Sequence, residues 1–271
     1  MEPLALLFDE AIGDALPLPS ELLELYGPLR MASRPDRPHV YANFVASVDG
    51  IVAVDPPRGT GGEISGGDRH DRAVMGLLRA VADAVVIGGG NLRAEGDHVW
   101  TGERIFPELA GPYARLRAAM GKPPAPLQVV VSGSGDLDLS RAVFSGPAPS
   151  VVVTTAEGAA RLRGQRSAVR VVVPEPRTGW ISLAAVLTAV ELEPGALALV
   201  ESGPTSTTRF LGEGAVDELF LTRSPFFVGR SDELPTLALI EGRTFRPGTL
   251  GGRLLSARRS GDFLFLRYGM R

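Results

Sequence analysis

The sequence predicts an α/β protein with three layers, in which helices flank both faces of a mostly parallel sheet. Two observations lead to this fold class. Short apolar runs alternate with helical patterns along the 271 residues, which is typical of parallel strands joined by right-handed crossovers. Near the end of the chain, two further runs flank the turn Ser260, Gly261 and Asp262, which predicts a C-terminal antiparallel hairpin.

The predicted strands are short and apolar, as strands buried on both faces of a sheet are. They cover residues 39–50, 84–87, 127–131, 151–155, 169–173, 196–200 and 216–223, followed by 253–259 and 263–268 in the hairpin. Helices are predicted at residues 68–82, 113–120, 156–162, 183–191 and from Pro204 to the glycines at 212 and 214. We expect the hairpin to lie at a sheet edge, where unpaired backbone groups form a natural dimer contact.

The chain divides into an N-terminal extension, residues 1–36, and one domain, residues 37–271. The extension is interrupted by Pro17, Pro19, Pro28 and Pro35, which limit any helix there to short pieces. We expect the extension to lie along the surface of the domain. With 44% hydrophobic residues, the remainder can bury one large core.

Composition excludes several classes of function. A net charge of −3 gives no basic excess, so a nucleic acid is not an expected partner. The chain has no cysteine and three histidines, which leaves few ligands for a metal and disfavours a metal hydrolase. No apolar run reaches the roughly 20 residues of a membrane span, and residues 1–7 lack the basic flank of a secretory signal. We therefore expect a cytoplasmic protein that acts on a small molecule.

The stretch 196–229 contains the clearest candidate site. Glu201 ends a buried strand and stands in front of a turn rich in glycine and hydroxyl groups, which continues into a helix at Pro204. A helix start with free N–H groups and hydroxyls suits a phosphate group. An ordinary helix cap rich in Ser and Thr explains the same residues. This stretch contributes Gly203, Pro204, Thr205, Ser206, Thr207 and Arg209 to the candidate binding residues.

The first predicted strand carries a polar row on one face. With a period of two, Asn43, Ser47 and Asp49 share the face of Tyr41 and Val45. Polar groups on a buried strand need partners or a ligand. For Asp49, followed by Gly50, a plain turn is the other interpretation. The glycine-rich loop at 55–68 is either a flap that orders over a ligand or a floppy surface loop.

Two more strands end in small or polar residues. Gly88 and Gly89 follow the second strand and allow backbone to approach a ligand closely. Asn91 either caps the next short helix or contacts a cofactor, and Glu95 lies four residues further on. Ser132 ends the third strand. Because the carboxyl ends of parallel strands meet at one edge, we expect these clusters to share one crevice with Glu201.

Arg79 lies in the last turn of the predicted helix at 68–82. There it either reaches the last carbonyl groups of its helix or directs its guanidinium at an anion.

Four motifs of the sequence resemble those of a known family. ANFVASVDG, ISGGDRHDRAVMGLLRAVADAVVIGGGNLRAEG, LQVVVSGSG and ALVESGPTSTTRFLGEGAVDELFLTRSPFFVG occur in the order seen in the C-terminal reductase domain of the riboflavin-biosynthesis protein RibD. The resemblance covers residues 37–268 and implies a dihydrofolate-reductase-like fold. It also implies an NADPH-dependent pyrimidine reductase, usually a homodimer, that converts the ribosyl group of a phosphorylated aminopyrimidine to a ribityl chain.

The resemblance assigns roles residue by residue. It implies substrate contacts by Arg79, Glu201 and the position of Asn43, where many members have Lys. Asp49 belongs to the signature S-x-D-G. The implied cofactor contacts are Ala46 and Ser47 at the nicotinamide, Asn91, Glu95, Ser132 near the 2′-phosphate, and the pyrophosphate loop from Gly203 to Arg209.

In such a reductase the cofactor carries the hydride, and the protein aligns and polarises the acceptor and supplies a proton. Asp49 and Glu201 are the candidate acids at the strand ends. Two other functions stay open: a pterin or dihydrofolate-type reductase on the same fold, and an NADPH-binding protein without turnover. The zinc deaminase half that often precedes this domain has no counterpart motif in the chain.

Overall fold

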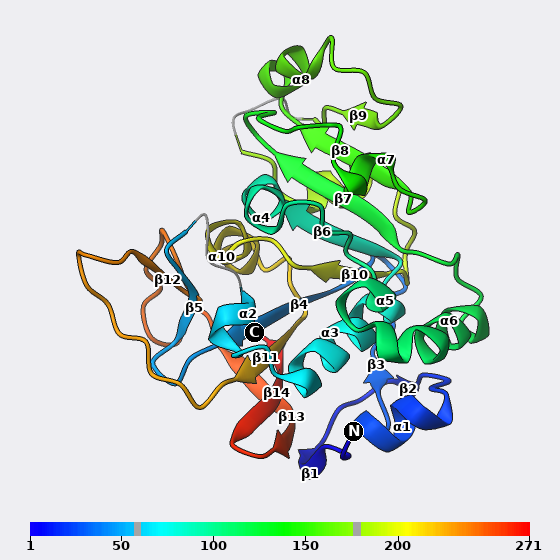
Figure 1. Cartoon of the computed structure of the whole chain (residues 1–271), viewed down its shortest axis with the longest axis vertical. Coiled ribbons are helices and arrows are strands. Elements are labelled where there is room, and N and C mark those ends of the chain that lie inside the picture. The colour runs from blue at the N-terminus through cyan, green and yellow to red at the C-terminus, as the bar shows by residue number, and fades with distance from the viewer. Residues whose placement is uncertain (57–60, 176–179) are drawn as a thin grey trace.

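The computed structural model describes residues 1–56, 61–175 and 180–271. Its ten-stranded sheet has the order β1-β13-β14-β11-β4-β10-β6-β7-β8-β9 (Figure 1). From β11 to β9 all neighbouring strands are parallel, and β1, β13 and β14 are antiparallel to their neighbours. The predicted α/β fold with a mostly parallel sheet is therefore confirmed.

The strands of the parallel part match the predicted apolar runs within a few residues. They are β4 (His39–Ala46), β6 (Ala84–Gly88), β7 (Leu127–Ser132), β8 (Ser150–Thr154), β9 (Arg170–Val172), β10 (Leu197–Val200) and β11 (Glu218–Arg223). Most of their residues are buried, because helices cover both faces of this part of the sheet.

The longer helices also lie where the sequence predicts them: α3 (Arg69–Val81), α6 (Ala110–Ala119), α8 (Ala156–Leu162), α9 (Leu183–Ala189) and α10 (Pro204–Gly212). Four other helical segments are α4 (Gly89–Glu95), α5 (Gly102–Ile105), the 3-10 turn η1 (Pro107–Leu109) and α7 (Ala142–Ser145). The backbone N–H of Asp71 bonds the side chain of Asp68 at 2.8 Å, so Asp68 caps α3.

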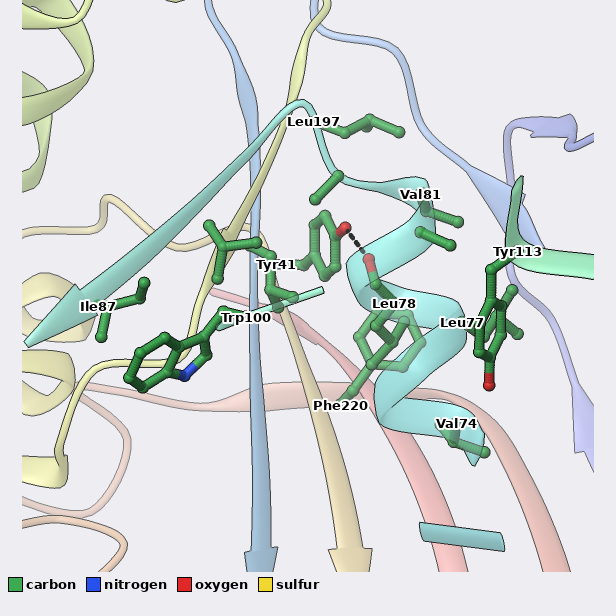
Figure 2. Packing of buried hydrophobic residues seen from close by; sticks show 14 of the residues in the cluster. Tyr41, Val74, Leu77, Leu78, Val81, Ile87, Trp100, Tyr113, Leu197 and Phe220 are labelled. Atoms are coloured by element: carbon green, nitrogen blue, oxygen red, sulfur yellow. Dashed lines mark hydrogen bonds between the residues drawn. The ribbon is translucent and has the colours of Figure 1, made fainter. Parts of the chain in front are cut away.

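Two hydrophobic clusters pack against opposite faces of the sheet, which gives the three layers. Alternate residues of β4 enter different clusters: Tyr41 packs with α3, whereas Val40 packs with α9 and α10. Figure 2 shows the α3 side, where the Tyr41 hydroxyl donates to the Leu78 carbonyl at 2.8 Å and the Tyr41 ring meets Phe220 edge-on. Each fully buried side chain of this size contributes about 1.5–3 kcal/mol to stability.

The C-terminal hairpin, β13 (Gly252–Ser260) and β14 (Phe263–Met270), is not at the edge of the sheet, so that prediction was wrong. Strand β1 (Ala5–Asp9) of the N-terminal extension pairs with β13 and covers it (Figure 1). The buried Arg258 joins the two, since it donates to Asp9 at 2.8 Å and to the Tyr26 carbonyl at 2.7 Å. The hairpin edge therefore cannot be the dimer contact that the sequence suggested. The domain boundary after residue 36 stays a prediction.

The rest of the extension forms α1 (Ser20–Tyr26) and a small sheet of β2 (Asp14–Ala15) and β3 (Arg30–Met31). Another small sheet joins β5 (Ile51–Val54) to β12 (Thr236–Ala238).

Two local predictions need correction. Part of the glycine-rich stretch that was expected to be a loop is the short helix α2 (Gly61–Ile64), and residues 57–60 of it lie outside the described residues. Asn91 does not cap α4, because that helix already begins at Gly89 with Gly88 as its cap residue. Among the described residues, no helix is long and apolar enough to cross a membrane.

Candidate active site

A pocket of about 790 Å³ lies at the carboxyl ends of β4, β6, β7 and β10. This volume is within the range of sites that enclose cofactors and small substrates. Twelve of the residues that the sequence singled out line it: Asn43, Arg79, Gly88, Gly89, Asn91, Glu95, Ser132, Glu201, Gly203, Pro204, Thr205 and Ser206. Three of the four expected strand-end clusters therefore converge in the structure, whereas the cluster of Ser47 and Asp49 does not line the pocket.

One side of the pocket consists of backbone turns and hydroxyl groups; we call it the turn side (residues 88–91, 132–134 and 202–206). Here α4 and α10 start beside each other at the ends of β6 and β10 (Figure 1). A Cβ atom on Gly88 would lie 3.5 Å from the Gly203 backbone nitrogen, and one on Gly89 would lie 3.2 Å from the Ser132 side chain. Glycine thus allows the three turns to approach one another closely.

Hydrogen bonds fix the shape of the turn side. Thr154 donates to the Ser132 carbonyl at 2.6 Å, and Thr155 donates to the Gly133 carbonyl at 2.7 Å. Helix α10 begins with Gly203 as its cap residue and Pro204 in its first turn. The positive end of the helix dipole, together with the hydroxyls of residues 205 and 206, therefore faces the pocket. These features suit the phosphates of a dinucleotide.

The other side carries charged side chains; we call it the charged side (Asn43, Asp71, Arg79, His98 and Glu201). Arg79 and Glu201 form its centre. The Arg79 guanidinium donates to the Glu201 carboxylate from Nη2 at 2.6 Å and from Nε at 3.0 Å, and the two side chains are 3% and 8% exposed. The sequence left open whether Arg79 bonds the last carbonyl groups of its helix or directs its guanidinium at an anion. The structure supports the second interpretation, and the anion is the Glu201 carboxylate.

His98 completes the cluster. Its Nε2 lies 2.9 Å from Arg79 Nη1, and because a guanidinium can only donate, Nε2 accepts and carries no proton. Burial, with the charges of Arg79 and Arg104, lowers the pKa of His98 to about 3. The imidazole is therefore neutral, and its hydrogen is on Nδ1, which lies 4.0 Å from the Glu95 carboxylate.

Asp71 is the second buried carboxyl group on this side. It lies in the first turn of α3, is 4% exposed and lines the pocket. Burial raises its pKa to about 6, helped by the negative charges of Asp68 and Glu201 and opposed by hydrogen bonds to Thr222 and Ser65. It can therefore exchange a proton near neutral pH.

Ser47 and Asp49 do not line the pocket and instead hold a turn. The Ser47 hydroxyl donates to Asp49 Oδ1 at 2.7 Å, and the backbone N–H of Gly229 donates to Oδ2 at 2.7 Å. These bonds, with one from the Val228 N–H, lower the pKa of Asp49 to about 2. Asp49 has the geometry of the plain turn that the sequence also allowed.

Three other residues that were predicted to contact the cofactor do not line the pocket. The Ala46 carbonyl accepts from Ser224, the buried Thr207 hydroxyl donates to the Ser202 carbonyl at 3.1 Å, and the exposed Arg209 stacks over Trp180 at 4.4 Å. Asn91 connects the turn side to the charged side, since its amide donates to the Glu201 carbonyl at 2.9 Å.

Residues 38–248 match the RibD C-terminal domain. The chain belongs to that family. The family resemblance inferred from the motifs is confirmed, and the matched residues include every part of the pocket named above.

Individual relatives agree with this assignment. The chain is 27% identical over 214 residues to the 2,5-diamino-6-ribosylamino-4(3H)-pyrimidinone 5′-phosphate reductase of Archaeoglobus fulgidus, covering 77% of this chain and 89% of the relative. A pyrimidine reductase-like protein from Corynebacterium diphtheriae has the same fold, with a TM-score of 0.66, 23% identity and coverage of 86% and 92%. RibD of Acinetobacter baumannii gives a TM-score of 0.58 at 19% identity, and the match covers 87% of this chain and 58% of RibD.

Sequence reasoning missed Asp71 and His98. In the sequence, Asp71 is one of several charged residues at the start of a helix, where a carboxylate commonly stabilises the helix through its dipole. His98 stands in a segment without strong periodicity. Both reach the pocket through contacts between distant parts of the chain, so no local pattern marks them.

Proposed function

We propose that the protein is an NADPH-dependent reductase that transfers hydride to the ribosyl group of a phosphorylated ribosylaminopyrimidine, a step of riboflavin biosynthesis. The observation that carries the proposal is the two-sided pocket, in which phosphate-binding turns face a buried Arg79–Glu201 pair. The family match and the activity named for the A. fulgidus relative support the substrate class.

The turn side fits a nicotinamide dinucleotide. The start of α10 suits its pyrophosphate, and Ser132 lies where the family resemblance expects the 2′-phosphate region of NADPH. The glycines at 88, 89 and 203 leave room for ligand atoms close to the backbone. When bound, the cofactor supplies the hydride.

The charged side fits the pyrimidine and its phosphate. Arg79 holds the Glu201 carboxylate in one orientation, so that Glu201 can accept hydrogen bonds from amino groups of a substrate. Arg72 and Arg104 line the pocket with exposed side chains, and we assign them to the substrate phosphate. Asn43 lines the same pocket and supplies an uncharged hydrogen-bond donor and acceptor.

Asn43 also motivates a second candidate, a pterin or dihydrofolate-type reductase, because many family members have Lys at this position. The test is NADPH oxidation by the purified protein with the phosphorylated ribosylaminopyrimidine, compared with dihydrofolate and a pterin. We expect oxidation with the pyrimidine alone. Oxidation with dihydrofolate alone would replace the first candidate by the second, and saturable NADPH binding without oxidation of any of the three would indicate a protein that only binds the cofactor.

A homodimer and a cytoplasmic location, which the sequence and the resemblance led us to expect, stay predictions. Light scattering of the purified protein tests the first, and fractionation of cells tests the second.

A further inference from the structure

The proposed reduction needs a proton donor, and neither acid chosen from the sequence fits that role. Asp49 does not line the pocket, and its pKa is lowered to about 2. Glu201 lines the pocket, but the Arg79 guanidinium occupies both of its oxygens as a donor. A carboxylate bound in this way is suited to accept hydrogen bonds.

We propose that Asp71 is the catalytic acid of this pocket, which delivers a proton to the substrate nitrogen as the hydride reaches the adjacent carbon. This inference rests on the proposed function and adds the residue that completes the reaction.

The position of Asp71 in the pocket supports the proposal. Asp71 is 4% exposed and lines the pocket as part of the charged side. The hydroxyls of Ser65, which follows α2, and of Thr222 in β11 lie near enough to its carboxyl group to lower its pKa. Thr222 pairs with Val45 of β4, two residues beyond Asn43 on the same face of that strand. Residues from two elements thus lie next to Asp71 on the charged side of the pocket, which we assign to the substrate.

The hydroxyl partners are suited to both protonation states. A hydroxyl can donate to a carboxylate and can accept from a carboxylic acid, so neither state of Asp71 leaves a buried group unsatisfied. A backbone N–H group can only donate, so the two N–H groups that bond Asp49 favour its carboxylate form over the carboxylic acid.

The charges around Asp71 favour the protonated state. Asp68 at the start of the same helix and Glu201 at the end of β10 both raise its pKa, as does burial. The nearest cation in sequence, Arg72, has an exposed side chain, and Arg79 is engaged by Glu201. The resulting pKa of about 6 is close to a working pH near neutrality, where proton transfer by a general acid is effective.

Glu95 is the competing candidate. It also lines the pocket, and burial raises its pKa. However, its side chain is 31% exposed and lies next to Arg79 and His98, at the junction with the turn side. Water reaches Glu95 more easily than Asp71, which makes Glu95 the weaker choice for a directed transfer.

The substrate reacts as an open-chain imine, and hydride forms a C–H bond at the imine carbon. The π electrons of the C=N bond move to nitrogen, which takes the proton from the Asp71 carboxyl group as the O–H bond breaks. The products are a secondary amine, the oxidised nicotinamide and the Asp71 carboxylate, which regains its proton from water.

Asp71→Asn tests this role, with Asp68→Asn as the matched control. Both variants remove one negative charge from the start of α3, and Asn is also a good cap residue at 68. We expect Asp71→Asn to lower kcat by about 10²–10⁴-fold, the usual contribution of a general acid, with NADPH affinity unchanged within about twofold. The wild-type rate should fall as pH rises above about 6, and this dependence should vanish in Asp71→Asn. In Asp68→Asn it should persist and move to lower pH, because Asp68 raises the pKa of Asp71.

A direct titration of Asp71 in the wild-type protein, by isotope-edited NMR of its carboxyl carbon, does not depend on activity or on the variants. A midpoint near 6 supports the proposal, and a midpoint near 4 overturns it. A raised KM with unchanged kcat and an unchanged pH profile in Asp71→Asn would also overturn it. Wild-type protein that oxidises no NADPH with the pyrimidine contradicts the proposed function instead, so the two failures are distinguishable.

Discussion

The two sides of the pocket are built by different means. The turn side uses backbone, glycine and hydroxyl groups from three short segments, residues 88–91, 132–134 and 202–206, each of which is continuous in sequence. The charged side uses long side chains that meet across the chain: Arg79 and Glu201 are 122 residues apart. The turn side holds few formal charges, whereas the charged side buries an ion pair, a neutral imidazole and a carboxyl group with a raised pKa.

This difference separates binding from chemistry. Backbone turns and a helix start can hold phosphates without titrating, so the turn side should respond little to pH. Burying a charged group on folding costs free energy, and the pKa of the buried group depends on its neighbours. Such groups are common where protons are transferred. Substitutions on the charged side should therefore change turnover, and substitutions on the turn side should change cofactor affinity.

Apart from Asp71→Asn, the largest effect is expected for Glu201→Gln. Removing one partner of a buried ion pair leaves the Arg79 charge uncompensated, which costs about 3–5 kcal/mol. We expect kcat/KM for the pyrimidine to fall by about 10²-fold or more, while the NADPH Kd changes by less than about threefold. Steady-state kinetics and a cofactor titration measure the two quantities. Equal losses in both would contradict the division into two sides.

The second prediction is that the buried Asp71 carboxyl group lowers the free energy of unfolding as the pH rises. Its native pKa of about 6 lies above the unfolded value of 3.8, so the native state binds the proton more tightly and loses relative stability as pH rises from about 4 to 6. Asp71→Asn has no such loss. We expect it to exceed the wild type in unfolding free energy by about 1–3 kcal/mol at pH 8, with a smaller difference at pH 4.

Urea unfolding at the two pH values checks this second prediction. A difference that is the same at pH 4 and pH 8 would show that Asp71 has an ordinary pKa. Ser132→Ala, on the turn side, serves as the comparison, and its effect on stability should not depend on pH over this range.

Thr205→Asp tests the turn side. Thr205 is exposed in the first turn of α10 and lines the pocket. A carboxylate there is favourable for the helix itself but repels a phosphate. We expect the NADPH Kd to rise by about tenfold in low salt, whereas Thr205→Asn, of nearly equal size, stays close to wild type. If both variants bind alike, the start of α10 is not the phosphate site.

The smallest effect is expected for Asn91→Ala, which removes the bond between the two sides. The Asn91 amide donates to the Glu201 carbonyl, and a hydrogen bond of this kind contributes about 0.5–1.5 kcal/mol. We expect kcat/KM and the NADPH affinity to fall together, each by about two- to fivefold. A change confined to one of the two quantities would assign Asn91 to a single side.

The sequence predicted the turn side better than the charged side. Strand ends such as Val200 and turns such as Gly88 to Gly90 leave local patterns, because a buried strand is apolar and a close approach requires glycine. The ends of parallel strands share one edge, so the convergence of these turns follows from the fold class alone.

The charged side could be predicted only in part. Glu201 was recognised because it interrupts an apolar run, but nothing in the sequence indicates that Arg79 is its partner. Asp71 and His98 titrate abnormally because of burial among residues from other elements, which no window of sequence displays. Strand β1 was missed for a similar reason: its partner β13 is more than 240 residues away.

The two-sided pocket is best tested by a structure of the protein with bound NADP⁺. We expect the pyrophosphate to contact residues 203–206 and the nicotinamide ring to face Glu201 and Asn43, within reach of a substrate in contact with Asp71. A dinucleotide bound elsewhere on the molecule, or one bound in this pocket with its nicotinamide pointing away from the charged side, would contradict it.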